Sequence, residues 1–330
     1  MNLSFNSKLS RKLNPISVYS KLVSFFFGFF LDWLEKLIIT RHRKSSDKTN
    51  RKPVFIIGAP RSGSTLFYQI LINELDVLYI SNFTHVFFRW LNIGFALEKR
   101  FLNKKRNFSL TSNYGDTLKS GWGAPSECGD FWYVKLPRNR HYATELDVTS
   151  DATEFFKNSI EVPMESEGKP FVFKNMHAGQ RIKYIRAVLP DAKFIFISRE
   201  LSANVQSIIK ARLDIRGDKN AWWSIKPKEY SFLKEKDYLT QVVGQVYFIE
   251  QQIKKDFDEI PDQNKLTISY EQLCENPDLV LSDVADFTFG SNQNFKLQSP
   301  ITLKKSSKNF LSKTEIDEIE LIADSFKLNV

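Results

Sequence analysis

The feature that most constrains this chain is a glycine-containing turn between an apolar run and an amphipathic stretch. Residues 54–58 (VFIIG) are apolar and end at a glycine, and residues 65–72 repeat apolar side chains at helical spacing. Between them, residues 58–65 read Gly-Ala-Pro-Arg-Ser-Gly-Ser-Thr. The pattern predicts a strand, a turn and a helix, in which backbone N–H groups and the positive end of the helix surround an anion.

Further apolar runs of strand length follow the turn. They lie at residues 171–174, 193–198 and 266–270, and an amphipathic stretch at residues 181–189 precedes the second of them. Continuously apolar strands that alternate with helices predict a parallel sheet covered on both faces. We therefore expect an α/β, P-loop-like three-layer fold with a central parallel sheet flanked by helices.

The length and composition are those of one large globular domain with an extension. The chain has 330 residues, of which 42% are hydrophobic and 26% are charged, which is ordinary for a folded protein. The composition changes near residue 50. We expect an N-terminal helix and linker over residues 1–50 and a single globular domain over residues 51–330.

The turn departs from the nucleotide-binding pattern G-x-x-x-x-G-K-[ST] in an informative way. Ser64 stands where that pattern has lysine, and the strand at 193–198 is followed by Arg199 rather than by an acidic residue that would hold Mg²⁺. An arginine there repels a metal and attracts a phosphate. The pattern thus favours a site for two anionic groups with no metal ion between them. Sulfuryl transfer fits such a site, because a phosphosulfate carries less charge than a triphosphate, whereas a P-loop kinase or nucleotidase is the rival interpretation.

These residues resemble the superfamily of sulfotransferases that use 3'-phosphoadenosine 5'-phosphosulfate (PAPS), in particular a bacterial branch. The resemblance implies that the 5'-phosphosulfate of PAPS is bound by Arg61, Ser62, Gly63, Ser64 and Thr65. It also implies that Arg199 and Ser207 bind the 3'-phosphate and that Tyr270 approaches the adenine. PAPS would serve as the co-substrate, with no metal.

The resemblance covers roughly residues 53–290 and leaves the first 50 residues unmatched. Its further segments are residues 125–132, 193–212, 217–227 and 269–277, and a basic segment at residues 304–308 is weakly similar. The turn at residues 60–65 and the segment at residues 199–207 occur in the correct order and on the expected elements, which makes the similarity more specific than either segment would alone.

The resemblance implies that Lys174 lies near the bridging oxygen of the donor. Three residues are candidates for the base that removes the proton of the acceptor. Glu127 is the first candidate, because it follows a proline in a glycine-containing loop between the two phosphate-binding segments. His177 is the second, although cytosolic members of the family carry their histidine where this chain has Met176. His85 is the third, and the choice stays open.

The N-terminal segment contains an uncharged apolar run, residues 22–31, after a basic start. The run is too short for a membrane span, which needs about 20 residues, and no cleavage site for a secretory signal follows. Aromatic residues at helical spacing predict either peripheral membrane contact through residues 17–39 or a helix docked on the protein's own core. A non-catalytic membrane-associated binding protein with this fold is a second rival.

The charge and the rare residue types limit the partners and the location. A net charge of +9 suits an anionic ligand or a membrane surface, but dispersed basic residues without a recognition motif argue against nucleic acid. Four histidines without ligand spacing predict no metal site, and two cysteines favour the reducing cytoplasm, with attachment to the inner face of the membrane as an extension. The expected acceptor is a hydroxyl on a small molecule, a saccharide or a lipid-linked molecule.

Overall fold

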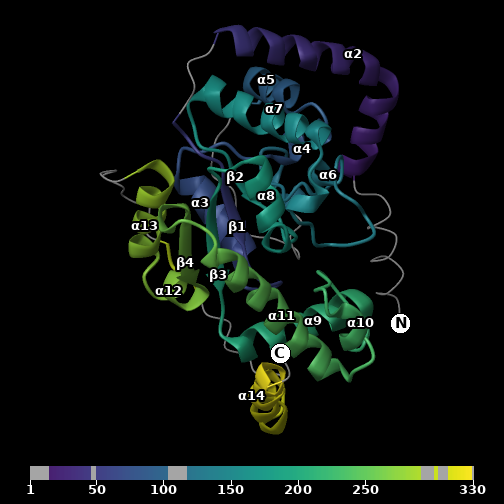
Figure 1. Ribbon diagram of the computed structural model, residues 1–330, viewed down its shortest axis with the longest axis vertical. Helices are drawn as coiled ribbons and strands as arrows, with labels where there is room; N and C mark the ends of the chain where they lie inside the picture. Colours follow the sequence, from purple (N-terminus) through teal and green to yellow (C-terminus); the bar gives the residue numbers. More distant parts are fainter. Residues whose placement is uncertain (1–14, 46–49, 103–116, 291–300, 304–310, 329–330) are drawn as a thin grey trace.

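The computed structural model describes residues 15–45, 50–102, 117–290, 301–303 and 311–328 (Figure 1). A sheet of four parallel strands lies at the centre, in the order β2-β1-β3-β4. The strands are β1 (Val54–Ile57), β2 (Val172–Lys174), β3 (Lys193–Ser198) and β4 (Lys265–Ser269). Each predicted strand is present to within a residue at either end, and the predicted parallel sheet is confirmed.

Helices surround this sheet. The longer ones are α2 (Pro15–Ser45), α3 (Ser64–Glu74), α5 (Leu91–Phe101), α7 (Ser150–Glu167), α8 (Ile182–Val188), α9 (Leu201–Arg216), α11 (Tyr238–Asp258), α13 (Pro277–Phe289) and α14 (Lys313–Leu328). The shorter ones are α4 (Asn82–Val86), α6 (Gly129–Trp132), α10 (Tyr230–Leu233) and α12 (Tyr270–Glu275), with 3-10 turns η1 (Leu118–Ser120), η2 (Glu145–Asp147), η3 (Ala178–Gln180) and η4 (Asp262–Asn264). The predicted helices at residues 65–72 and 181–189 are α3 and α8.

The two faces of the sheet have different cores because successive side chains of a strand point to opposite sides. On one face Phe55 stacks on Phe173 and Phe194, with ring centroids 5.1 and 5.5 Å apart, under α6, α7, α8, α9 and α11. On the other face Val54 and Ile56 pack against α3, α12 and α13. Helices bury both faces of the sheet, which confirms the expected three layers and explains why the strands are continuously apolar.

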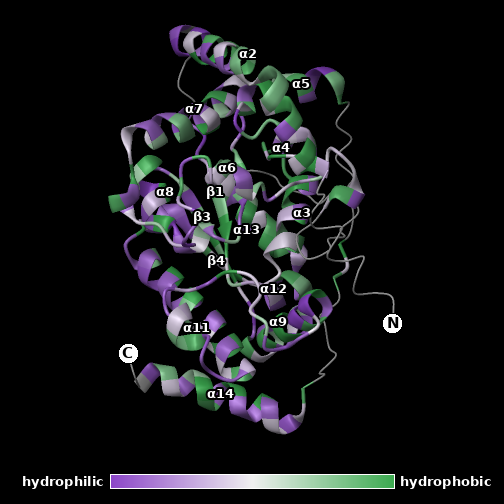
Figure 2. Ribbon diagram, turned by 90° about the vertical axis from the view of Figure 1, so that its right-hand side faces the viewer, coloured by the Kyte–Doolittle hydropathy of each residue, from purple (hydrophilic) through white to green (hydrophobic). Residues whose placement is uncertain are grey.

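Helices α2 and α14 lie at opposite ends of the molecule (Figure 2). Helix α14 packs against α11, whereas α2 runs over α4, α5 and α7 and bends down one side (Figure 1). One side of α2 is docked on the domain, with Leu31 in a small apolar cluster with Trp90 and Ile93. Among the described helices, none is long and apolar enough to cross a membrane.

Candidate active site

The turn after β1 has a backbone that fits a small anion. Arg61 and Gly63 have φ angles of 67° and 91°, in the left-handed region, and a Cβ on Gly58 would lie 2.5 Å from the carbonyl oxygen of Ile197. Gly63 precedes the first turn of α3 and provides no side-chain cap. The N-terminal N–H groups of this helix are therefore left for an anion.

The second helix beside the turn has its N-terminus already capped. The carboxylate of Glu200 accepts hydrogen bonds from the backbone N–H groups of Ser202 (2.8 Å) and Ala203 (2.7 Å) at the start of α9. An anion near α9 would thus be bound by side chains rather than by this helix end. Of these two helix ends, that of α9 is capped by a side chain and that of α3 is not.

The two predicted phosphate-binding segments meet directly. Arg61 Nε donates to Ser207 Oγ at 3.0 Å, and Arg199 Nη1 donates to the backbone oxygen of Arg61 at 3.0 Å. These residues come from the turn, from the end of β3 and from α9. The structure therefore brings the segments together at the carboxyl end of the sheet, as their spacing predicted.

Tyr270 belongs to the same cluster. The guanidinium of Arg199 lies 4.7 Å from the centroid of its ring, and a Cβ on Gly63 would come within 2.3 Å of that ring. Burial raises the pKa of the Tyr270 hydroxyl. The ring covers the turn at Gly63, which leaves no room for a larger residue there.

Two buried polar atoms in this region lack hydrogen-bond partners among the described residues. They are Ser62 Oγ and Arg199 Nε. Burying such a group without a partner is unfavourable, so both are suited to an oxygen-rich ligand. Ser64, the first residue of α3, is also buried beside them.

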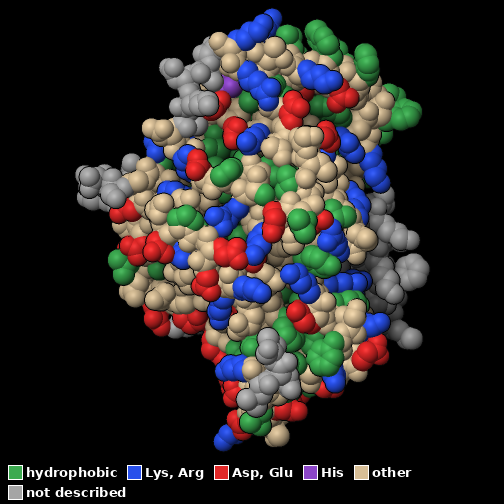
Figure 3. Space-filling view, viewed as in Figure 1, with side chains coloured by type: hydrophobic (Ala, Val, Ile, Leu, Met, Phe, Trp, Pro, Cys, Tyr) green, Lys and Arg blue, Asp and Glu red, His purple; other side chains and the backbone are tan. Residues whose placement is uncertain are grey.

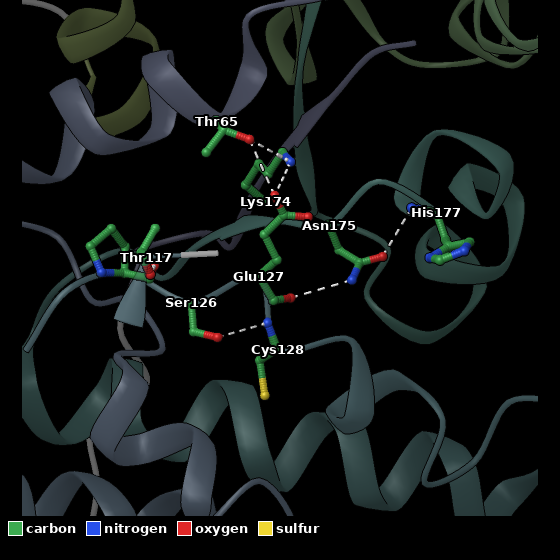
Figure 4. A network of polar contacts seen from close by, with 9 residues as sticks. Thr65, Thr117, Ser126, Glu127, Cys128, Lys174, Asn175 and His177 are labelled. Atoms are coloured by element: carbon green, nitrogen blue, oxygen red, sulfur yellow. Dashed lines mark hydrogen bonds and ion pairs between the residues drawn. The ribbon is translucent and has the colours of Figure 1, made fainter. Parts of the chain in front are cut away.

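A second cluster joins the turn to the predicted catalytic residues (Figure 4). Lys174 ends β2 and is 3% exposed; its Nζ donates to Thr65 Oγ1 at 3.0 Å and forms an ion pair with Glu127 Oε1. Thr65 Oγ1 also donates to Glu127 Oε1 at 3.2 Å. The lysine and the first candidate for the base are thus in contact with each other and with Thr65, beside the turn after β1.

The loop that carries Glu127 is held by its neighbours. Ser126 Oγ accepts from the backbone N–H of Cys128 at 3.2 Å, and Asn175 Nδ2 donates to the backbone oxygen of Glu127 at 3.3 Å. Cys128 has a φ of 39°, which is strained for a residue with a side chain. These contacts direct the Glu127 carboxylate towards Lys174.

His85 supports this loop from α4. Its Nδ1 is 2.8 Å from Ser126 Oγ, and its Nε2 is 3.5 Å from Asp130 Oδ2. Burial lowers the pKa of His85, but interactions with Cys128 and with the Asp130 carboxylate outweigh it and raise the value to about 10. Both ring nitrogens of the third candidate base are therefore engaged with the loop.

His177 lies in different surroundings. Its ring is packed 4.5 Å from the ring of His141 and 5.8 Å from that of Tyr133, measured between centroids, and it points away from the Glu127–Lys174 pair in Figure 4. Burial first, then the charge of Arg181, lowers the pKa of His177 to about 3. The imidazole is neutral at pH 7.

One residue of the second cluster was not predicted from the sequence. Asn175 has no motif of its own, although its place directly after the strand-end lysine is a usable signal.

The segment at residues 217–227 packs against the core. Arg212 lies 5.2 Å from the Trp222 ring, and Gln245 Nε2 donates to the backbone oxygen of Trp223 at 3.0 Å. The basic segment at residues 304–308 lies outside the described residues. Within the described ranges, no group of three or more His, Cys, Asp and Glu side chains could hold a metal ion.

The chain was compared with families of known proteins and with solved structures. A model of the "Sulfotransferase family" matches residues 53–289. No curated protein matches the chain. Similar solved structures include sulfotransferase STF9 from Mycobacterium avium (15% identity, TM-score 0.45, 72% of this chain and 63% of that one) and a sulfotransferase from Alicyclobacillus acidocaldarius (14%, 0.47, 83% and 92%). Sulfotransferase STF1 from Mycobacterium tuberculosis is another (13% identity, TM-score 0.47, 87% and 84%). The chain thus spans less than two thirds of the Mycobacterium avium protein.

Proposed function

Since the chain belongs to the sulfotransferase family, we propose that it moves a sulfuryl group from PAPS to a hydroxyl of a carbohydrate, a glycolipid or another small acceptor. The observation that carries this proposal is the position of Thr65, which links the anion-binding turn to the Lys174–Glu127 pair. A donor on the turn would have its reacting group beside a base and a cation. The family match also favours this activity over a P-loop kinase or nucleotidase.

The donor would be held by the clusters already described. Backbone N–H groups at the start of α3, with Ser62, Ser64 and Thr65, suit the 5'-phosphosulfate, and Arg199 with Ser207 suits the 3'-phosphate. The partnerless Ser62 Oγ and Arg199 Nε would gain acceptors from such an anion. We propose that donor binding needs no Mg²⁺, because Arg61, Lys174 and Arg199 supply positive charge where a nucleotide kinase uses the metal.

Glu127 is the proposed base. Its carboxylate would take the proton of the acceptor hydroxyl while that oxygen forms a bond to sulfur, and the bond from sulfur to the bridging phosphate oxygen would break. The electron pair would remain on the phosphate, where Arg61 and Lys174 stabilise the developing charge. The acceptor proton therefore ends on Glu127 and the leaving group is adenosine 3',5'-bisphosphate.

The Lys174–Glu127 ion pair suggests how the two roles are coupled. In the present arrangement the Lys174 ammonium occupies Glu127 Oε1, one of the two oxygens that could take the acceptor proton. A bound phosphosulfate would draw the Lys174 ammonium towards its own oxygens. Glu127 would then be released for the acceptor hydroxyl only when the donor is present.

Transfer of labelled sulfate tests the proposal. The enzyme and labelled PAPS would be incubated with fractionated cell-envelope glycans and lipids, and we expect label in at least one fraction, with formation of adenosine 3',5'-bisphosphate. A lipid-linked acceptor is favoured if α2 meets a membrane. Binding of the bisphosphate without transfer to any fraction, and without slow hydrolysis of PAPS, would instead indicate a binding protein that retains the fold.

A further inference from the structure

Helix α2 presents its two sides in an unusual way. The side that faces the protein includes polar residues, since Ser20 and Glu35 are 5% and 7% exposed. The opposite side carries an aromatic face, which we define as Phe25, Phe26, Phe29, Phe30 and Trp33, all more than half exposed. Phe29 reaches 92%. A surface helix normally has the reverse distribution.

The rotation of α2 about its axis is fixed by buried hydrogen bonds. The carboxylate of Glu35 accepts from the backbone N–H groups of Asn92 (3.2 Å) and Ile93 (3.1 Å), at the start of α5. Trp90 Nε1 donates to Asp32 Oδ1 at 2.7 Å. Turning α2 to bury its aromatic face would break these bonds and leave a carboxylate unpaired in the core. The aromatic face is therefore exposed because of the way the helix is docked.

Both ends of α2 are also attached to the domain. Near its carboxyl end, His42 Nε2 lies 2.8 Å from Glu165 Oε2, and Arg43 Nη2 donates to Asn158 Oδ1 at 2.6 Å. Near its start, the rings of Tyr19 and Trp122 meet edge to face at 5.8 Å. The exposed rings are thus presented by a helix with contacts along its length.

Basic residues accompany the aromatic face. Within α2, Lys21, Lys36, Arg41 and Lys44 are exposed, whereas the helix's acidic residues, Asp32 and Glu35, are bonded to Trp90 and to α5. Figure 3 shows hydrophobic side chains beside Lys and Arg along the upper right edge of the molecule, where α2 lies in Figure 1. Apolar and basic side chains thus lie side by side at this edge, with a few acidic ones among them.

We propose that the aromatic face inserts into the headgroup layer of an anionic phospholipid bilayer, with the exposed lysines and arginines of α2 on the lipid phosphates. Bulky aromatic rings flanked by basic residues match the apolar depth and the negative surface of such a bilayer. A second copy of the chain fits less well, because a twofold pair would bring the same basic residues together. This attachment is independent of the transferase activity.

Vesicle flotation of the full-length protein tests the inference. The probes are vesicles of phosphatidylcholine alone and vesicles that also contain phosphatidylglycerol, each at low and at high salt. We expect the wild type to float with the anionic vesicles at low salt and to be partly released by salt. The double variant Phe25→Ser, Phe29→Ser should bind at least about tenfold more weakly, because two phenyl rings are no longer available for burial in the bilayer.

The matched control removes two other apolar residues that are more than half exposed, on different helices. Leu279 and Leu321 are 62% and 70% exposed on α13 and α14, and the double variant Leu279→Ser, Leu321→Ser should float like the wild type. Circular dichroism would establish that both double variants are folded. The variant Lys36→Glu should bind more weakly to the anionic vesicles and be unchanged towards vesicles of phosphatidylcholine alone. The inference is overturned if the wild type stays unbound at low salt or if the Phe variant binds equally well. It is also overturned if sedimentation shows that the wild type is a dimer and that the Phe variant is a monomer.

Discussion

The two halves of the proposed site differ in how the fold holds them. The donor half, consisting of the turn with Arg61, Arg199, Ser207 and Tyr270, stands on the carboxyl ends of parallel strands and the helices that follow them. The acceptor half, centred on Glu127, stands on a loop that α4 and Asn175 hold in place. The donor is the same molecule in every reaction, so residues fixed at the ends of strands can bind it. Acceptors differ, and loops can vary to accommodate them. Lys174 touches both halves.

The substitution Glu127→Gln should have the largest effect, because it changes the acceptor half and leaves the donor half intact. It keeps the shape of the side chain and removes its basicity, and loss of a general base lowers a rate by about 10²–10⁴-fold. We therefore expect kcat to fall by that factor, while the affinity for adenosine 3',5'-bisphosphate stays within a few-fold of the wild type. Steady-state kinetics and calorimetry would measure the two quantities.

The control for Glu127 is His177→Asn, because His177 is the second candidate for the base. Its lowered pKa and its direction away from Lys174 lead us to expect a modest change in kcat. If His177→Asn abolishes turnover and Glu127→Gln preserves it, the assignment is reversed and the acceptor half must be rebuilt around the histidine.

The donor half is tested by Arg199→Ala. Removal of a charged hydrogen-bonding group costs about 1.5–3 kcal/mol, so the bisphosphate should bind roughly tenfold or more weakly, with and without Mg²⁺. The control is Arg216→Ala, which removes an exposed arginine at the end of the following helix, α9, and should bind as the wild type does. Equal affinities in the Arg199 variant and the wild type would remove Arg199 from the donor half.

The same contrast explains what could be predicted from the sequence. The sheet, the turn and the meeting of Arg199 with Arg61 follow from local patterns, since strand ends of a parallel sheet gather at one edge. The support of Glu127 by His85 and Ser126 depends on contacts between residues 41 positions apart, and no local pattern encodes it. The docking of α2 through Glu35 is of the same kind, because a carboxylate in an apolar helix gives no sign of its distant partner.

A smaller effect should follow from Ser126→Ala, which removes the hydroxyl between His85 and the Cys128 N–H. A lost hydrogen bond of this type is worth about 1 kcal/mol, so we expect kcat to fall several-fold with KM for PAPS unchanged, because Glu127 is less well positioned. Ser126→Thr, which restores the hydroxyl, should recover most of the rate. A fall in thermal stability with unaltered kcat would instead make Ser126 a purely structural residue.

A separate effect concerns the stability of the folded protein in acid, through His177. Its pKa is lowered to about 3 in the folded protein, against about 6.5 when unfolded. As pH falls below about 6.5, the unfolded chain therefore binds a proton that the folded chain refuses, and the free energy of unfolding falls by up to about 1.4 kcal/mol per pH unit. Glu250 and Asp256, whose pKa values burial raises to about 7 and about 6, act in the opposite direction. Both are present in wild type and in His177→Asn, so the difference between the two urea-unfolding curves at pH 7 and pH 5 isolates His177. We expect the variant to lose less stability on acidification, and an identical loss in both proteins would mean that the imidazole takes up a proton in the folded state as readily as in the unfolded chain.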